Sequence, residues 1–239
     1  MPGGPRVSGE PRSANGASSF HLWWRGIPAG APVVAAEVTL ELVTPPAVPR
    51  LYFWALQASF TDRGTPRGAG HLGLQWHPAH PGSTAVNWGG YHEGGGELDG
   101  TISTLPSALG NPNTRDLAWR TGAAHRLVIA SVGDGAWRGS IDGVAVRDLQ
   151  AGGAHLAALV VWSEVFARCD DPSVTVRWSD LTAITAAGER LRPEAVQVSY
   201  QARRDGGCDN TNAAVDGLGV VQTTNTARQV APGAVLDLR

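Results

Sequence analysis

A glycine-flanked segment near the middle of the chain gathers residue types that recognise sugars. Asn87, Trp88 and Tyr91 are followed by His92, Glu93 and three glycines. The segment is too polar to be buried whole, so we expect an exposed loop. Its flat rings could stack on a sugar ring while its amide, imidazole and carboxylate groups bond the hydroxyls. We therefore predict a ligand-binding site here; the alternative is that the tryptophan belongs to the core, as most do in a β-sandwich.

Four further side chains could enlarge this site. Gln75 and His77 stand on the strand face opposite Trp76, so their polar tips would extend the site across a sheet. Glu164 and Arg177 are the other two binding candidates, for which the alternative is an ordinary ion pair.

The histidines form one cluster in the sequence, at positions 71, 77 and 80, which invites a metal interpretation. Structural zinc needs four convergent ligands, and the two cysteines lack the Cys-x-x-Cys spacing. We favour histidines in loops and on sheet faces over a metal site. No glycine-rich phosphate loop and no serine nucleophile elbow occur.

The two cysteines, Cys169 and Cys208, lie in polar, turn-like contexts. Free cysteines are usually buried among apolar neighbours, so we favour a disulfide, with two free thiols as the alternative. A disulfide implies an oxidising compartment. Residues 1–6 open no apolar signal core, and no stretch of 18 apolar residues occurs. We expect an extracellular protein with no membrane span, and a cytoplasmic one is the alternative.

The composition describes a globular chain with many turns. The 239 residues include 31 glycines and 16 prolines, and the 19 basic and 21 acidic side chains give a net charge of −2. Such a balance provides no general attraction to nucleic acid or to anionic lipid, so we expect neither partner. Residues 1–18 have almost no apolar side chains and are expected to form a flexible lead-in.

The remaining residues, 19–239, have the pattern of one antiparallel β domain, with 196–239 as a C-terminal wrap. Residues 34–43 alternate apolar and polar side chains, and residues 51–60 carry aromatics on both parities, as an inner strand would. Further strands are expected at 70–77, 125–132, 136–142, 144–146, 157–165 and 173–181. So many strands in one chain must stack as two sheets, so we predict an all-β sandwich.

Several short motifs then resemble a known superfamily. They are the hairpin pair of residues 125–146, Leu72-Gly73-Leu74-Gln75, Trp162-Ser163-Glu164-Val165, Val176-Arg177-Trp178-Ser179-Asp180 and Gly207-Cys208-Asp209-Asn210-Thr211-Asn212. Over residues 50–225 the chain resembles concanavalin A-like lectin and glucanase jelly rolls, and among them a bacterial, often secreted group of unknown function. The resemblance implies a two-sheet antiparallel jelly-roll sandwich with a concave sheet that binds saccharides. It also supports the disulfide, because the group places its cysteines similarly.

The same resemblance suggests where calcium and catalytic acids would lie. Calcium could be held by carboxylates near the disulfide, at Asp170, Asp171 and Asp209. Related glucanases carry Glu-x-Asp-x-x-Glu on one strand. The nearest match here has Glu97 and Asp99 but replaces the third acid with isoleucine.

We therefore predict a lectin-like sandwich that binds a neutral glycan without catalysis and without a cofactor other than the calcium alternative. Two alternatives stay open. One is a glycoside hydrolase or polysaccharide lyase, whose acids would be Glu93, Glu97, Asp99 and Glu164; the other is a structural or protein-interaction domain.

Overall fold

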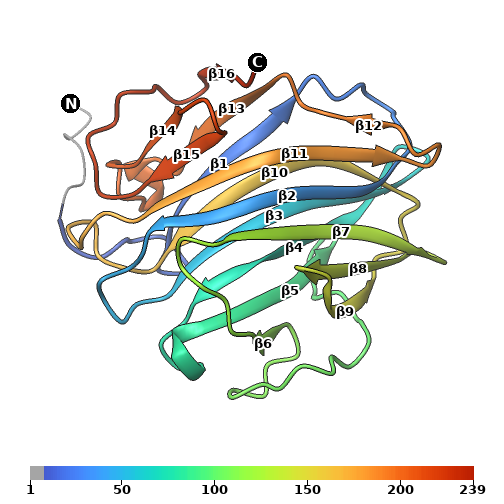
Figure 1. Cartoon of the computed structure of the whole chain (residues 1–239), viewed down its shortest axis with the longest axis horizontal. Coiled ribbons are helices and arrows are strands. Elements are labelled where there is room, and N and C mark those ends of the chain that lie inside the picture. Colours follow the sequence, from blue (N-terminus) through green and yellow to red (C-terminus); the bar gives the residue numbers. More distant parts are fainter. Residues whose placement is uncertain (1–7) are drawn as a thin grey trace.

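The computed structural model describes residues 8–239 and folds them into two antiparallel β layers (Figure 1). One layer, the groove sheet, contains in spatial order β16 (Val235–Asp237), β13 (Ala195–Tyr200), β1 (Ser18–Arg25), β10 (His155–Val165), β3 (Tyr52–Asp62), β4 (Thr65–Trp76), β5 (Thr84–His92) and β6 (Thr114–Asp116). The other, the outer sheet, contains β14 (Asn212–Val215), β15 (Val220–Thr223), β11 (Thr175–Thr185), β2 (Val33–Thr44), β7 (Ala124–Gly133), β8 (Ala136–Ile141) and β9 (Val144–Gln150), with β12 (Arg190–Leu191) along β11.

The two layers are joined by one bridge between Val33 and Leu156. This architecture confirms the predicted all-β jelly-roll sandwich. Helical structure within residues 8–239 is limited to two 3-10 turns, Pro81–Ser83 and Arg203–Asp205. None of the helical turns in this described part is long and apolar enough to cross a bilayer.

The core lies between the layers and is built by strand alternation. In β3, Trp54 points into the core while its neighbour Phe53 points to the opposite face of the groove sheet. Trp88 of β5 is fully buried, and its indole N–H donates to the Trp137 carbonyl of the outer sheet at 3.3 Å. A buried indole needs such a partner. The indoles of Trp119 and Trp137 likewise donate to backbone carbonyls, those of Ala85 and Gly153.

The segment expected as an exposed loop is the strand β5, and this corrects the prediction. Glycines at 89 and 90 suggested a flexible loop, but they serve close packing between strands. A Cβ on Gly90 would lie 2.2 Å from the Ala69 carbonyl oxygen, and one on Gly89 would lie 3.0 Å from the Asn113 side chain. Substitution at Gly90 would force the β4 and β5 backbones apart.

The N-terminal segment is more ordered than the sequence predicted. Residues 8–17 pack on the sandwich, whereas a flexible lead-in through residue 18 was expected; residues 1–7 lie outside the described residues. The Arg12 backbone N–H donates to the Gly206 carbonyl at 2.8 Å, and Ala17 is fully buried. Hydrogen bonds to distant residues thus order a stretch that has little hydrophobicity of its own.

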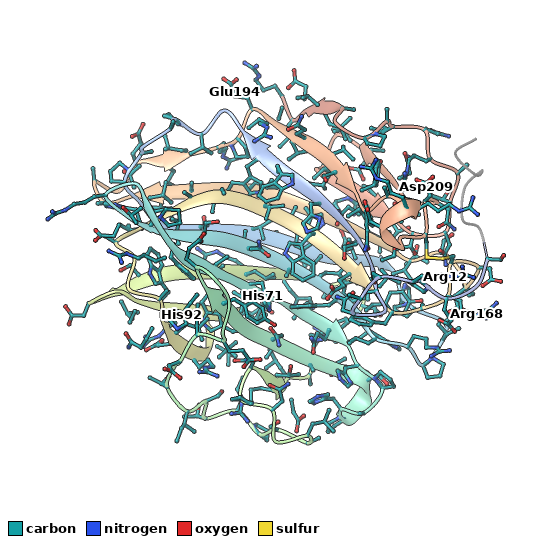
Figure 2. All side chains as sticks on the ribbon, turned by 180° about the vertical axis from the view of Figure 1, so that it is seen from behind. Arg12, His71, His92, Arg168, Glu194 and Asp209 are labelled. Atoms are coloured by element: carbon teal, nitrogen blue, oxygen red, sulfur yellow. A yellow bond between two sulfur atoms is a disulfide. The ribbon has the colours of Figure 1, made fainter. Side chains whose placement is uncertain are left out.

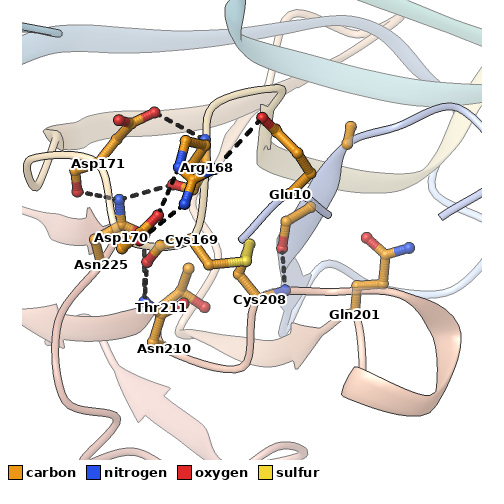
Figure 3. Close-up of a disulfide and its surroundings, with 12 residues drawn as sticks. Glu10, Arg168, Cys169, Asp170, Asp171, Gln201, Cys208, Asn210, Thr211 and Asn225 are labelled. Carbon is orange, nitrogen blue, oxygen red and sulfur yellow. Dashed lines mark hydrogen bonds and ion pairs between the residues drawn. A yellow bond between two sulfur atoms is a disulfide. The ribbon is translucent and has the colours of Figure 1, made fainter. Parts of the chain in front are cut away.

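The predicted disulfide is confirmed (Figure 3). Cys169 and Cys208 are bonded, with their Cα atoms 5.2 Å apart. The Cys169 backbone N–H donates to the Gly9 carbonyl at 2.8 Å, and the Asn210 side-chain amide donates to the Cys169 carbonyl at 2.6 Å. The bond therefore joins the loop after β10, the C-terminal tail and the N-terminal segment at one point.

Candidate binding groove

The face of the groove sheet that points away from the core carries a second, smaller aromatic cluster (Figure 2 looks onto this face). Phe53 and Trp162 meet edge to face, with ring centroids 4.9 Å apart. His71 contacts both rings, at 5.7 Å from Phe53 and 5.9 Å from Trp162. These three side chains come from three neighbouring strands, β3, β10 and β4, and share one face because each strand alternates.

A cavity of 320 Å³ opens beside this cluster. The side chains around it are Asn15, Ser19, His21, Phe53, Gln57, His71, Tyr91, Trp162 and Glu164. Its size lies at the lower end of the range for small-molecule sites. Rings and hydrogen-bonding groups therefore share one hollow on an otherwise regular sheet.

Hydrogen bonds fix two of the polar groups in the cavity. The Trp162 indole N–H donates to the Gln57 amide oxygen at 3.0 Å. This leaves the Gln57 amide N–H₂ with donors for a ligand. The Asn15 amide donates to the Glu164 carboxyl at 2.7 Å, so the N-terminal segment supplies one wall.

Burial shifts His21, His71 and Glu164 of the cavity toward their uncharged forms. It lowers the pKa of His21 and of His71 to about 4. It also raises the pKa of Glu164, against a smaller opposing effect of the Asn15 hydrogen bond. Since desolvation penalises the charged form of each group, both imidazoles are neutral at pH 7.

A second cavity, of 420 Å³, lies along the same strands, and Tyr91 belongs to both cavities. His92 and Glu93 stand at its edge. Tyr91 is 53% exposed and lies 6.3 Å from the His71 ring. We call the two cavities together the groove.

The structure brings some predicted site residues together and separates others. Tyr91 and Glu164 line the first cavity, and His92 and Glu93 line the second. Trp88 is fully buried in the core, so we leave it out of the proposed site. Trp88 and Tyr91 point to opposite faces of β5. This difference was not predicted, because the segment was expected to be a loop without alternating faces.

Gln75 and Asn87 lie on the same face as the groove but are almost completely buried. The Asn87 amide donates to the Thr114 hydroxyl at 2.9 Å. The side-chain oxygens of Gln75 and Asn87 have no partner among residues 8–239. His77 lies just after β4, with its ring 4.6 Å from that of His80. These side chains extend the polar face beyond the two cavities.

Arg177 is remote from the groove, on β11 of the outer sheet. Its guanidinium pairs with the carboxylates of Glu41 and Asp216, which is the ordinary ion-pair alternative. The Glu97 carboxylate accepts from the Asn113 amide at 3.2 Å, and Asp99 is exposed. Neither acid lines either cavity of the groove.

The disulfide brings together the loops that carry the calcium candidates (Figure 3). The Asp170 carboxylate pairs with Arg168 at 3.0 Å, and that of Asp209 pairs with Arg228. The Asp171 carboxylate accepts from the Arg168 backbone N–H at 2.8 Å. In the described part of the chain, no three His, Cys, Asp or Glu side chains converge as metal ligands. These carboxylates already have cationic or N–H partners.

Sequence reasoning missed His21, Phe53, Gln57 and Trp162 as groove residues. The signal that could have found them is the parity rule that placed Gln75 opposite Trp76. Applied to residues 51–60, this rule places the odd-numbered residues on the face away from the core and the even-numbered residues in the core. Which residues on neighbouring strands share that face depends on register, which follows from pairings such as Val160 with Gln57.

No family model matches the sequence, and no curated protein sequence matches it. Among solved structures, it is similar to Scytalido-glutamic peptidase bound to a peptide-based transition state analog. The identity is 9%, with 87% of this chain and 98% of the peptidase covered and a TM-score of 0.49. The carbohydrate-binding module CBM66 from Bacillus subtilis has 9% identity, 74% and 92% coverage and a TM-score of 0.40.

A β-porphyranase from the human gut bacterium Bacteroides plebeius has 6% identity, 81% and 61% coverage and a TM-score of 0.30. Likenesses at this level concern the fold alone. The function must therefore be argued from the groove.

Proposed function

We propose that the protein is a non-catalytic, lectin-like domain that binds a neutral glycan in the groove. The observation that carries this proposal is the first cavity, where aromatic rings and uncharged hydrogen-bonding groups share one hollow. Tyr91, which is 53% exposed, would offer a flat face to the C–H side of a sugar ring, and Trp162, which is 7% exposed, would contact the ring from the wall of the cavity. Gln57, His21 and His71 would bond its hydroxyls.

The electrostatics of the cavity favour a neutral ligand. Its two imidazoles and its one carboxyl group are shifted toward their uncharged forms. None of the described side chains around it is an arginine, which is the side chain best suited to bind phosphate or carboxylate. A neutral imidazole offers one donor and one acceptor, and a sugar hydroxyl can bond either of them.

The first test is a glycan array followed by calorimetric titration of the best neutral saccharide. We expect Trp162→Ala to weaken binding by about 30-fold, the effect of losing a buried aromatic anchor. Tyr91→Ala leaves the core intact and should weaken binding by about tenfold. Leu218→Ala, a similarly exposed apolar residue remote from the groove, is the matched control and should bind normally. Unchanged affinity in both groove variants would refute the proposal.

The raised pKa of Glu164 favours one further candidate function, hydrolysis with this carboxyl as general acid. Glycosidases of the usual kind need a second carboxylate about 5 to 9.5 Å away. Among residues 8–239, Glu164 is the one acid that lines the first cavity, and Glu93, the other acid of the groove, is an exposed residue of the second cavity. We therefore prefer binding to catalysis.

The two functions are separated by Glu164→Gln, which keeps a neutral group of the same size. Binding predicts that this variant retains its affinity and that neither protein releases sugars from polysaccharides. Hydrolysis predicts product release by the native protein and its loss in the variant. Chromatography of soluble products measures both.

The disulfide indicates an oxidising environment. We propose that the domain acts outside the cell, where free polysaccharides are available as ligands. Mass spectrometry of a non-reduced digest from the native source tests this, since two free thiols would contradict it.

A further inference from the structure

Apart from Tyr91, which lines both cavities, none of the side chains assigned to sugar contacts above lines the second cavity. It lies beside the row of side chains Ser59, Ala69 and Tyr91, which are paired across β3, β4 and β5. The next row on the same face, toward the first cavity, contains Gln57 and His71. Same-face residues along a strand are on the order of 7 Å apart, the scale of one sugar ring.

We infer that the second cavity is a further subsite, so that the groove binds a linear oligosaccharide of at least two units lying along the strands across Tyr91. This inference rests on the proposed function. It adds the length and the direction of the ligand.

The second cavity exists because its floor is built from small residues. The residues that line it include Ser59, Gly68, Ala69, Ala157 and Ala158. Two irregularities shape it. The pairing of β10 with β3 shifts between Ala157 and Val160, and that of β3 with β4 shifts after Phe60. Bulges of this kind bend strands and often adjoin binding sites.

The backbone geometry favours small residues in part of this floor. A Cβ on Gly68 would lie 2.2 Å from the Tyr91 carbonyl oxygen, so this position holds glycine and its backbone approaches β5 closely. Ala158 has a φ of 47°, a conformation uncommon for residues other than glycine. The cavity is thus a product of the local backbone and not only of missing side-chain bulk.

Tyr91 is placed to contact both units. Its ring is half exposed, belongs to both cavities and lies beside His71. In the row formed by Ser59, Ala69 and Tyr91, Tyr91 is the one large side chain. A chain of sugars could therefore pass over Ser59 and Ala69. The ring would then stack on the unit at the junction.

The experiment measures affinity against chain length. Calorimetric titrations use neutral oligosaccharides of one to four units from the gluco, manno, galacto, xylo and N-acetylglucosamine series. We expect the best-binding series to gain at least about tenfold in affinity between one unit and three. Ala157→Phe, which fills the second cavity, should abolish this gain and leave the affinity for the monosaccharide unchanged.

Two further variants keep the result interpretable. Ser59→Phe fills the same cavity from β3, in case Ala157→Phe fails to fold. Ala145→Phe adds the same bulk at an exposed position of β9 and should retain the gain. Thermal melts check that each variant is folded.

The outcomes separate the two claims. Equal affinity for one unit and three in the native protein, or a gain that survives both filling variants, overturns the second subsite and leaves the proposed function intact. A lack of binding to every saccharide overturns the proposed function and the subsite with it.

Discussion

The two faces of the groove sheet use aromatic residues in opposite ways. On the core face, Trp88 is enclosed by apolar side chains and bonds a backbone carbonyl. On the groove face, the Trp162 indole bonds a side-chain amide beside a neutral histidine. The carbonyl that Trp88 bonds belongs to the enclosed backbone, whereas the Gln57 amide beside Trp162 keeps its N–H₂ donors next to the first cavity. The number of tryptophans therefore says less about function than the face of the sheet on which each indole and its partner lie.

The largest expected effect is the loss of stability caused by a substitution on the core face. Trp88→Ala removes a fully buried ring and leaves the Trp137 carbonyl without its partner. We expect the free energy of unfolding to fall by about 4 kcal/mol. Urea denaturation followed by circular dichroism measures this. A loss below about 1 kcal/mol would mean that the two faces do not differ.

The half-buried histidines His21 and His71 of the groove face should make stability depend on pH. Their folded pKa values of about 4 lie below the ordinary 6.5, so the unfolded chain binds more protons between these values. The stability contribution of the neutral imidazoles is complete above pH 6.5 and is lost as the pH falls toward 4. We expect His71 to cost the native protein on the order of 2 to 3 kcal/mol of unfolding free energy between pH 6.5 and pH 4. The variant His71→Gln should not show this loss.

Urea midpoints between pH 4 and pH 7 measure this effect. His92→Gln, at an exposed histidine, is the control and should follow the native protein. Parallel curves for the native protein and His71→Gln would contradict the assignment.

Glu164 should have the opposite pH dependence. Its folded pKa is raised by burial, so the folded protein holds a proton that the unfolded chain has released. Stability therefore falls as the pH rises from the ordinary value near 4.5 through the raised one. We expect Glu164→Gln to gain stability relative to the native protein across this window, with a constant difference above it. A difference that does not change with pH would refute burial as the cause.

The smallest effect is expected at Tyr91, three residues from Trp88 on the same strand. Its side chain is half exposed on the groove face, so Tyr91→Ala should change the free energy of unfolding by about 0.5 kcal/mol or less. Paired with Trp88→Ala in the same denaturation series, it measures the contrast between the faces directly. A loss as large as that of Trp88→Ala would show that the tyrosine supports the core.

Local alternation was enough to predict most of the sandwich. The inward positions of Leu72 and Leu74, and the outward position of Gln75, followed from it and agree with the structure. The strand at 84–92 could not be predicted in this way, because Gly90 is required by contact with a neighbouring strand and not by a turn. Long-range packing decides such positions.

The site was less predictable than the fold. Asn15 reaches Glu164 only because the N-terminal segment is bonded to loops that lie far along the chain. The assembly of Gln57, His71 and Trp162 depends on register between strands that are distant in sequence. A single sequence without homologues contains little information on either.

The hydrogen bond between Trp162 and Gln57 gives the domain a built-in optical reporter. Indole fluorescence responds to the polarity around the ring. Trp162 is 7% exposed and borders the first cavity, whereas the core residues Trp54, Trp88, Trp137 and Trp178 are at most 1% exposed. A saccharide that engages the Gln57 amide would change the surroundings of this one indole. Occupancy could then be followed by emission wavelength and by acrylamide quenching, without any attached dye.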